Sequence, residues 1–263
     1  MSEVIPSSSP IPETPSKEIS ETSTPSNTSP SKLDEGIAFL RDIVIILLLV
    51  IFVRSYLAAP FRISGSSMEE NYHDGEFIIV NKATYLDLGF TQFGNPKRGD
   101  VVVIKPHADI KKDFYIKRII GLPGDEIKID NGFVFLKKPG TKDFIQLNET
   151  YLSPANFGKT LPGRSSKDSS YLVPDGQYFL LGDNRNGSSD SRDCFYSCTT
   201  GNTTHFIHRS DIVGDLWATL GSVKIFENFD IFPPNISLAK NIGVDIAPRF
   251  LSTPRNWDYK ELN

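Results

Sequence analysis

The chain has 263 residues, enough for one large or two small domains with additional segments. Its 28 Lys and Arg against 32 Asp and Glu give a formal net charge of −4 without a basic stripe, which argues against nucleic-acid binding. Eighteen Pro and 19 Gly among short β-branched runs favour strands and turns over helices, and two Cys are too few for a disulfide scaffold.

Residues 1–34 are dominated by Ser, Pro, Thr and Glu and show no apolar periodicity. A segment of this composition cannot bury enough apolar surface to offset the entropy lost on ordering, so we predict a disordered tail. The apolar region that follows begins too far into the chain for a cleavable secretory signal.

Residues 36–59 are predicted to form one membrane-spanning helix. The uninterrupted apolar run, Ile43–Val53, is shorter than the ~18 residues that a span usually needs. Arg41 and Arg54 can extend their charged ends towards opposite interfaces while flanking apolar residues lengthen the segment, so a slightly mismatched span is feasible. A buried core helix or an interfacial helix is the alternative. Basic residues on both sides leave the orientation open.

The region from residue 60 to 230 is predicted to be a mainly β domain. Short β-branched or aromatic runs alternate there with Gly, Pro, Asn or Asp, a pattern typical of hairpins, and Asp-Asn-Gly at 130–132 is a turn signal. Residues 138–176 interrupt this pattern and are interpreted as an insertion, and 231–263 as an extension of unknown role. The predicted strands are Glu76–Asn81, Val101–Lys105, Ile127–Asp130, Phe133–Lys137 and Tyr178–Leu181.

A serine-rich turn directly follows the apolar segment, and we interpret Ser67 within it as a nucleophile. Gly and Ser are also ordinary turn residues, so the turn alone is weak support. A serine hydroxyl attacks a carbonyl only when a neighbouring base takes its proton, and none of the four His lies in a triad motif.

Lys117 is the better candidate for that base. It lies among Tyr115, Ile116, Ile119 and Ile120, and burial among such side chains disfavours the charged ammonium. To act near neutral pH, its pKa must fall by roughly 3 units from about 10.4, which corresponds to about 4 kcal/mol.

Four runs of sequence occur in an order that resembles the successive signature boxes of the bacterial type I signal peptidases. The resemblance extends over most of residues 37–225, and the four runs together form a strong signal, although each alone is weak. The runs are P-F-R-I-S-G-S-S-M (60–68), R-G-D-V-V-V (98–103), Y-I-K-R-I-I-G-L-P-G-D (115–125) and G-D-N-R-N-G-S-S-D-S-R (182–192).

The resemblance implies catalytic roles for three residues. The family nucleophile falls on Ser67, which is seven residues after Pro60 and directly precedes a Met. The general base falls on Lys117, and Ser188 matches the serine that orients this lysine. Ser66 is the rival nucleophile, because Ser-Gly-Ser at 64–66 imitates one form of the same box.

Further residues take supporting roles by the same resemblance. The Ser67 amide is the expected oxyanion donor, and Gly65 stands where some members add a hydroxyl, so backbone donation should dominate. Glu70 departs from the usual proline. We expect Arg118 to pair with Asp183, and Asp190 with Arg192, so that Ser188 reaches Lys117.

The family prefers small residues at the first and third positions before the cut. Its shallow apolar substrate pockets fall on a set of side chains that ordinary core packing could equally explain. These positions are Phe61, Ile63, Tyr72, Ile78, Val103, Tyr115 and Ile116.

Cys194 and Cys198, followed by His205 and His208, could suggest a zinc site, but the spacing fits no standard zinc finger. An exported domain favours a disulfide or free thiols instead. We therefore expect no metal.

The resemblance implies a signal-peptidase-like antiparallel β-sheet domain with one N-terminal transmembrane helix. The expected activity is cleavage of signal peptides from exported preproteins, without a cofactor, at the outer face of the cytoplasmic membrane and with the tail inside. The expected partners are signal peptides, the lipid bilayer and, as a candidate, the protein-export translocon, but no nucleic acid. The alternatives are a self-cleaving repressor-type Ser/Lys protease and an inactive membrane-tethered binding module.

Overall fold

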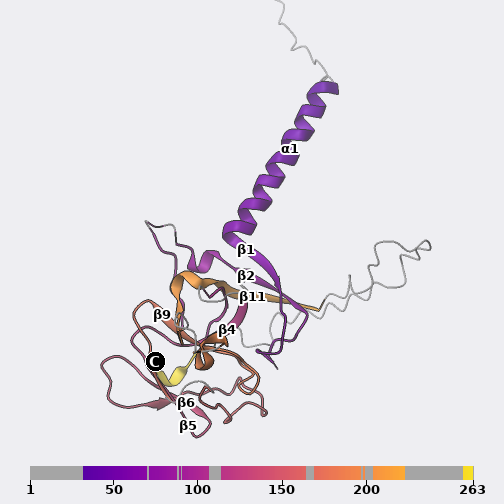
Figure 1. Cartoon of the computed structure of the whole chain (residues 1–263). Helices are drawn as coiled ribbons and strands as arrows, with labels where there is room; N and C mark the ends of the chain where they lie inside the picture. The colour runs from indigo at the N-terminus through magenta and orange to yellow at the C-terminus, as the bar shows by residue number, and fades with distance from the viewer. Residues whose placement is uncertain are drawn as a thin grey trace, which may run out of the picture. The chain divides into compact units, whose positions relative to one another are not determined.

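The structure is a computed structural model of the chain (Figure 1). Its contacts divide the chain into two units, Met1–Ile46 and Leu47–Asn263. The described residues are 32–69, 71–87, 89, 91–106, 114–163, 169–196, 198, 204–222 and 257–262.

One long helix precedes the strands. α1 spans Lys32–Phe52 and continues as the π-helical turn η1, Val53–Leu57. The stretch Glu35–Leu57 is 23 residues long, sufficiently apolar to cross a membrane, and none of its apolar window is buried by the rest of the protein. A helix that is apolar on all sides requires an apolar solvent, which a bilayer supplies.

The observed ends of this helical segment differ from the range 36–59 expected from the sequence. α1 begins at Lys32, inside the range assigned to the disordered tail, while residues 1–31 lie outside the described part of the chain. The segment ends earlier than expected, because Ala58 and Ala59 already pair with the next strand.

The larger sheet of the second unit has seven strands, and its neighbouring strands pair in antiparallel fashion. Two short 3-10 turns lie beside it, η2 (Ala83–Tyr85) and η4 (Arg209–Asp211). The strands in spatial order are β1 (Ala58–Arg62), β2 (Glu76–Asn81), β11 (Ile212–Ser222), β3 (Val101–Ile104), β4 (Tyr115–Gly121), β9 (Gln177–Leu181) and β10 (Ile207–His208).

A smaller antiparallel sheet has the order β7 (Ile145–Gln146), β6 (Phe133–Lys137), β5 (Glu126–Asp130) and β8 (Ser170–Leu172). The turn predicted at 130–132 joins β5 to β6, where Asn131 and Gly132 take positive φ angles of 49° and 86°. The prediction of a mainly antiparallel β fold with one N-terminal apolar helix is confirmed.

Three clusters of buried apolar side chains stabilise the second unit, Leu47–Asn263, which we call the β unit. One contains Met68 and lies beneath the serine-rich turn after β1, and a second contains Tyr85 and Leu180. The third joins the two sheets through Phe179 and Leu136. Burial of such side chains contributes roughly 1.5–3 kcal/mol each, which makes the packed sheets a rigid base for the loops between them.

Two further short elements complete the described part. η3 (Ser191–Tyr196) follows β9, and its helical geometry is broken at Asp193, Cys194 and Phe195. η5 (Lys260–Leu262) ends the segment 257–262, whose side chains join the third core cluster. Most of the extension that was assigned to 231–263 lies outside the described residues.

Candidate active site

The serine-rich turn is fixed between β1 and β2. Ile63 closes the hairpin, because its N–H donates to Glu76 O at 2.8 Å and its carbonyl accepts from Gly75 N at 2.9 Å. Gly65 bends the chain with a φ of 95°, a conformation that favours glycine. Met68 is buried in the core cluster beneath, so it anchors the neighbouring Ser67, which is half-buried.

Lys117 lies on β4, in the middle of the large sheet, opposite Val102 of β3. Its side chain is only 2% exposed. The ammonium nitrogen Nζ lies 2.8 Å from Ser67 Oγ and donates to Ile116 O at 2.9 Å. The strand thus carries the lysine to the serine across a separation of 50 residues in sequence.

Burial lowers the pKa of Lys117 from its ordinary value of 10.5 to about 8. The charges of Asp190 and Asp183 oppose this shift, and that of Arg192 adds to it. Removal from water disfavours the ammonium, so a substantial neutral fraction exists at mildly alkaline pH. Neutral Lys117 can accept the Ser67 proton through the same 2.8 Å contact.

The ion pairs named from the sequence are present. Arg118 and Asp183 are buried, at 0% and 1% exposed, and two guanidinium nitrogens donate to the carboxylate at 2.9 and 2.7 Å. Arg192 similarly binds Asp190 at 2.8 Å through two nitrogens. Burial alone would raise the pKa of Asp190, but the hydrogen bonds and charge of Arg192 outweigh it and hold that pKa below its usual value.

Ser188 differs from the expectation that it would reach Lys117. Its side chain is buried, and Oγ has no hydrogen-bond partner of normal geometry, although it lies close enough to Asp190 to help lower that carboxyl's pKa. It faces Gly182 instead, where a Cβ would collide with both Ser188 Oγ and Ser67 O. The backbone at 182 therefore lies between the two serines, and only glycine fits there.

Two asparagines that sequence reasoning did not assign hold the loop 182–192 against the serine-rich turn. Asn184 N donates to Ser67 O at 3.1 Å, and its side chain donates to Ser66 O at 3.0 Å. Asn71 Nδ2 donates to Asp183 at 2.8 Å. The only sequence signal for Asn184 was its place inside the matched run 182–192.

The oxyanion assignment is narrowed by the structure. The Gly65 N–H donates to Asp74 Oδ1 at 2.7 Å, so this donor is already engaged. The Ser67 amide is then the remaining candidate of the two. Glu70, whose departure from proline was noted in the sequence, lies outside the described residues.

The expected pocket residues largely belong to one cluster. Phe61 and Ile116 are partly buried and pack on the group that contains Met68, whereas Tyr115 packs on the neighbouring cluster. Of the seven expected pocket residues, these three alone are partly exposed and so are accessible to a substrate. The other four are buried in the same cluster as Met68, as in ordinary core packing; they are Ile63, Tyr72, Ile78 and Val103.

Cys194 and Cys198 form a disulfide, the state that the sequence left open. His205 Nδ1 lies 3.6 Å from Cys194 Sγ and 2.6 Å from Ser191 O. The three side chains are close enough to resemble a metal site. Because the sulfurs are bonded to each other, neither is available as the thiolate that zinc binding requires.

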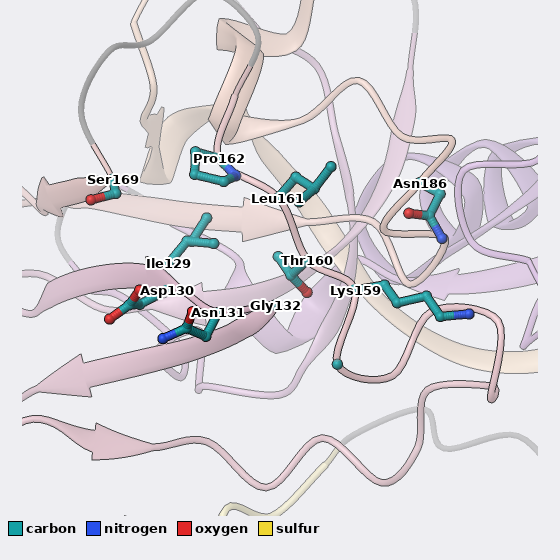
Figure 2. Close-up of a pocket in the computed structure, with 11 residues that line it drawn as sticks. Ile129, Asp130, Asn131, Gly132, Lys159, Thr160, Leu161, Pro162, Ser169 and Asn186 are labelled. Carbon is teal, nitrogen blue, oxygen red and sulfur yellow. The ribbon is translucent and has the colours of Figure 1, made fainter.

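A cavity of about 590 Å³ lies beside the loop 182–192 and is lined by the β5–β6 turn, residues 158–162, Ser169 and Asn186 (Figure 2). A second cavity, of about 560 Å³, lies next to η2 and η4. Neither Ser67 nor Lys117 lines these cavities, so both are separate from the serine–lysine pair.

A half-buried serine in contact with a buried lysine of lowered pKa, on an antiparallel β scaffold, is the arrangement of a Ser/Lys serine hydrolase. The chain belongs to the family described as signal peptidase, peptidase S26, which matches residues 36–220.

Curated relatives carry the same family name. Signal peptidase I of Pseudomonas aeruginosa is 34% identical over 187 residues, which is 63% of this chain and 64% of that protein. Signal peptidase I of Bacillus licheniformis is 34% identical over 169 residues, covering 62% of this chain and 82% of that protein. The matched part thus spans less than two thirds of the Pseudomonas relative.

A signal peptidase I crystal structure from Enterococcus faecalis is 25% identical, with a TM-score of 0.34. It covers 46% of this chain and 97% of the other.

The lowered pKa of Lys117 predicts a pH-dependent stability. Between pH 8 and 10.5 the unfolded chain keeps a lysine proton that the folded chain has lost, so stability rises with pH in this window. Relative to Lys117→Met, the wild-type free energy of unfolding should increase by about 3 kcal/mol from pH 7 to pH 11. Denaturant unfolding in detergent at a series of pH values measures this free energy for each variant. Lys142→Met, at an exposed lysine, is the control. If the difference in unfolding free energy between the wild type and Lys117→Met stays constant with pH, as it should for Lys142→Met, the prediction is wrong.

Proposed function

We propose that this protein is a membrane-anchored serine endopeptidase that removes signal peptides from exported preproteins, with Ser67 as nucleophile and Lys117 as general base. The observation that carries the proposal is the 2.8 Å contact between Lys117 Nζ and Ser67 Oγ, made by a lysine whose pKa burial lowers to about 8. Membership of the signal peptidase family and the names of the relatives support the choice of substrate.

Acylation begins when Ser67 Oγ attacks the scissile carbonyl carbon and its proton passes to Lys117 Nζ. The Ser67 amide donates to the oxyanion that forms. When the tetrahedral intermediate collapses, the carbon–nitrogen bond breaks and Lys117 returns the proton to the amine of the mature protein. The signal peptide then remains as an ester on Ser67.

Deacylation repeats these steps with water. Neutral Lys117 takes a proton from the water that attacks the ester, and the same proton returns to Ser67 as the signal peptide leaves as a carboxylic acid. The proposed steps use no cofactor. We assign Ser188 a positioning role for Lys117, for which its buried hydroxyl would have to turn towards that lysine.

Substrate choice is proposed to rest on apolar surfaces beside the nucleophile. Phe61 on β1 and Ile116 on β4 pack on the cluster that contains Met68, and Tyr115 precedes Ile116 on β4, so a small side chain before the cut would meet apolar walls. A charged side chain placed there would lose its hydration without a partner, which costs several kcal/mol. The translocon is a candidate partner only through the resemblance.

The nucleophile assignment predicts a sharp contrast between adjacent serines. Ser67→Ala should abolish cleavage of a preprotein with Ala at the first and third positions before the cut, whereas Ser66→Ala should retain substantial activity, because Ser66 is exposed and lacks the lysine contact. A substrate with a bulky residue at the first position is the negative control. If Ser66→Ala loses cleavage while Ser67→Ala keeps it, the nucleophile is Ser66 and not Ser67.

The base assignment predicts the pH profile. The kcat/KM of the wild type should rise with pH up to about 8, the pKa of Lys117, and then level off, since kcat/KM reports ionisation in the free enzyme. Lys117→Arg should be inactive although folded, because arginine does not lose its proton. Near-normal turnover of Lys117→Arg would rule out Lys117 as the base.

The apolar helix is proposed to anchor the chain with residues 1–31 in the cytoplasm and the β unit outside. This orientation places the nucleophile where exported preproteins emerge. A tag added before residue 1 should resist protease applied to intact cells and become sensitive after lysis, while the β unit behaves oppositely. Digestion of the tag in intact cells would refute the orientation.

A further inference from the structure

The segment Trp257–Leu262, which we call the clasp, packs against the β unit although more than 30 residues separate it from β11 (Figure 1, yellow). Tyr259 and Leu262 are buried in the core cluster that joins the two sheets, and Trp257 packs against it. Three apolar anchors within six residues indicate a specific docking site, because each removes a large side chain from water.

Hydrogen bonds fix the clasp in one register. Trp257 N donates to Gly99 O at 3.1 Å, and its indole Nε1 donates to Asn148 O at 2.8 Å. Lys138 Nζ also donates to Leu262 O. Gly99 has a φ of 91°, and a Cβ there would collide with the Trp257 carbonyl, so the clasp requires glycine at this position of the matched run 98–103.

The clasp reaches the site through Tyr151. The Tyr151 ring centroid lies 5.1 Å from that of Trp257 and 4.3 Å from the Arg118 guanidinium carbon, and its hydroxyl lies 3.0 Å from the Tyr259 hydroxyl. Arg185, from the loop that carries Ser188, donates to the same Tyr151 hydroxyl at 3.1 Å.

A second connection is direct. Arg118 Nη1 donates to Gly99 O at 2.9 Å, the carbonyl that also accepts from Trp257 N. Arg118 follows Lys117 on β4 and pairs with Asp183. The clasp and the buried ion pair therefore share one acceptor and one aromatic neighbour.

We propose that the clasp is a positioning segment of the active site: by holding Tyr151 and Gly99 against Arg118, it keeps the Arg118–Asp183 pair, and with it Lys117 and the loop 182–192, in the reactive arrangement. This inference rests on the proposed Ser/Lys chemistry. It assigns a role to part of the extension 231–263, for which the sequence predicted no role.

The proposal has an electrostatic consequence. The charged groups that act on Lys117 are Asp190 and Asp183, which favour its ammonium, and Arg192, which disfavours it. Loss of the clasp opens Tyr151 and admits water next to Arg118 and Asp183. A loosened Arg118–Asp183 pair leaves the carboxylate of Asp183, which favours the ammonium of Lys117, less compensated, so Lys117 holds its proton to higher pH.

The test uses the full chain in detergent. Trp257→Ala removes the ring contact with Tyr151 and the indole hydrogen bond, Trp257→Phe keeps a ring, and Tyr259→Phe removes only the hydroxyl contact. The control, Lys260→Ala, alters an exposed side chain of the same segment. For each variant, kcat, KM and the pH dependence of kcat/KM are measured with a signal-peptide substrate, together with the folded fraction.

Trp257→Ala should lower kcat at pH 7 by about tenfold or more with little change in KM, because small displacements of catalytic groups are costly. The acid limb of its kcat/KM profile should move upward by about half a pH unit or more. Trp257→Phe should recover much of the loss, Tyr259→Phe should show a smaller effect in the same direction, and Lys260→Ala should match the wild type.

An unchanged acid limb in Trp257→Ala would overturn the proposal, whether activity is normal or falls only in proportion to the folded fraction. If Trp257→Ala does not fold, Tyr259→Phe decides on the same criterion. Acylation of Ser67 by a small activated ester, followed by mass spectrometry across the pH range, gives an independent measure. If the wild type is acylated at Ser67 but does not cleave a signal peptide, the proposed function is refuted. The role of the clasp is then still tested by the acid limb of the pH dependence of acylation.

Discussion

The burial of one lysine is the constraint on which the rest of the site depends. Lys117, the proposed base, is neutral near pH 8 only if water is kept from it, and a strand inside a packed sheet achieves this at 2% exposure. The same burial destabilises the fold below pH 8, because the folded chain must then hold a charged ammonium away from water. The charges of Asp190 and Asp183 favour the ammonium and offset part of that cost.

The neighbouring charges are arranged in pairs that satisfy one another. Arg118 binds Asp183 and Arg192 binds Asp190, so two carboxylates lie near Lys117 without either being an unpaired partner for its ammonium. A single free carboxylate at the same place would raise the pKa of Lys117 and retain its proton. Paired charges therefore serve the chemistry as well as the packing.

The sequence predicted the β architecture, the apolar helix and the pairing of Lys117 with Ser67, because local patterns and ordered motifs carry those features. It did not predict that Ser188 would lack a hydrogen bond to Lys117, since the position of a hydroxyl depends on the path of Gly182 beside it. The docking of Trp257 against Gly99 joins residues far apart in the chain, and no periodicity records such a contact.

Gly182 has a consequence for how this site can vary. A Cβ at residue 182 would collide with both Ser188 Oγ and Ser67 O, so every replacement inserts a carbon atom between the two serines. No conservative choice exists at that position, because even alanine adds the offending atom. Residue 182 therefore accepts only glycine, and close backbone approach limits the variation of this site as strictly as its proposed reactive groups do.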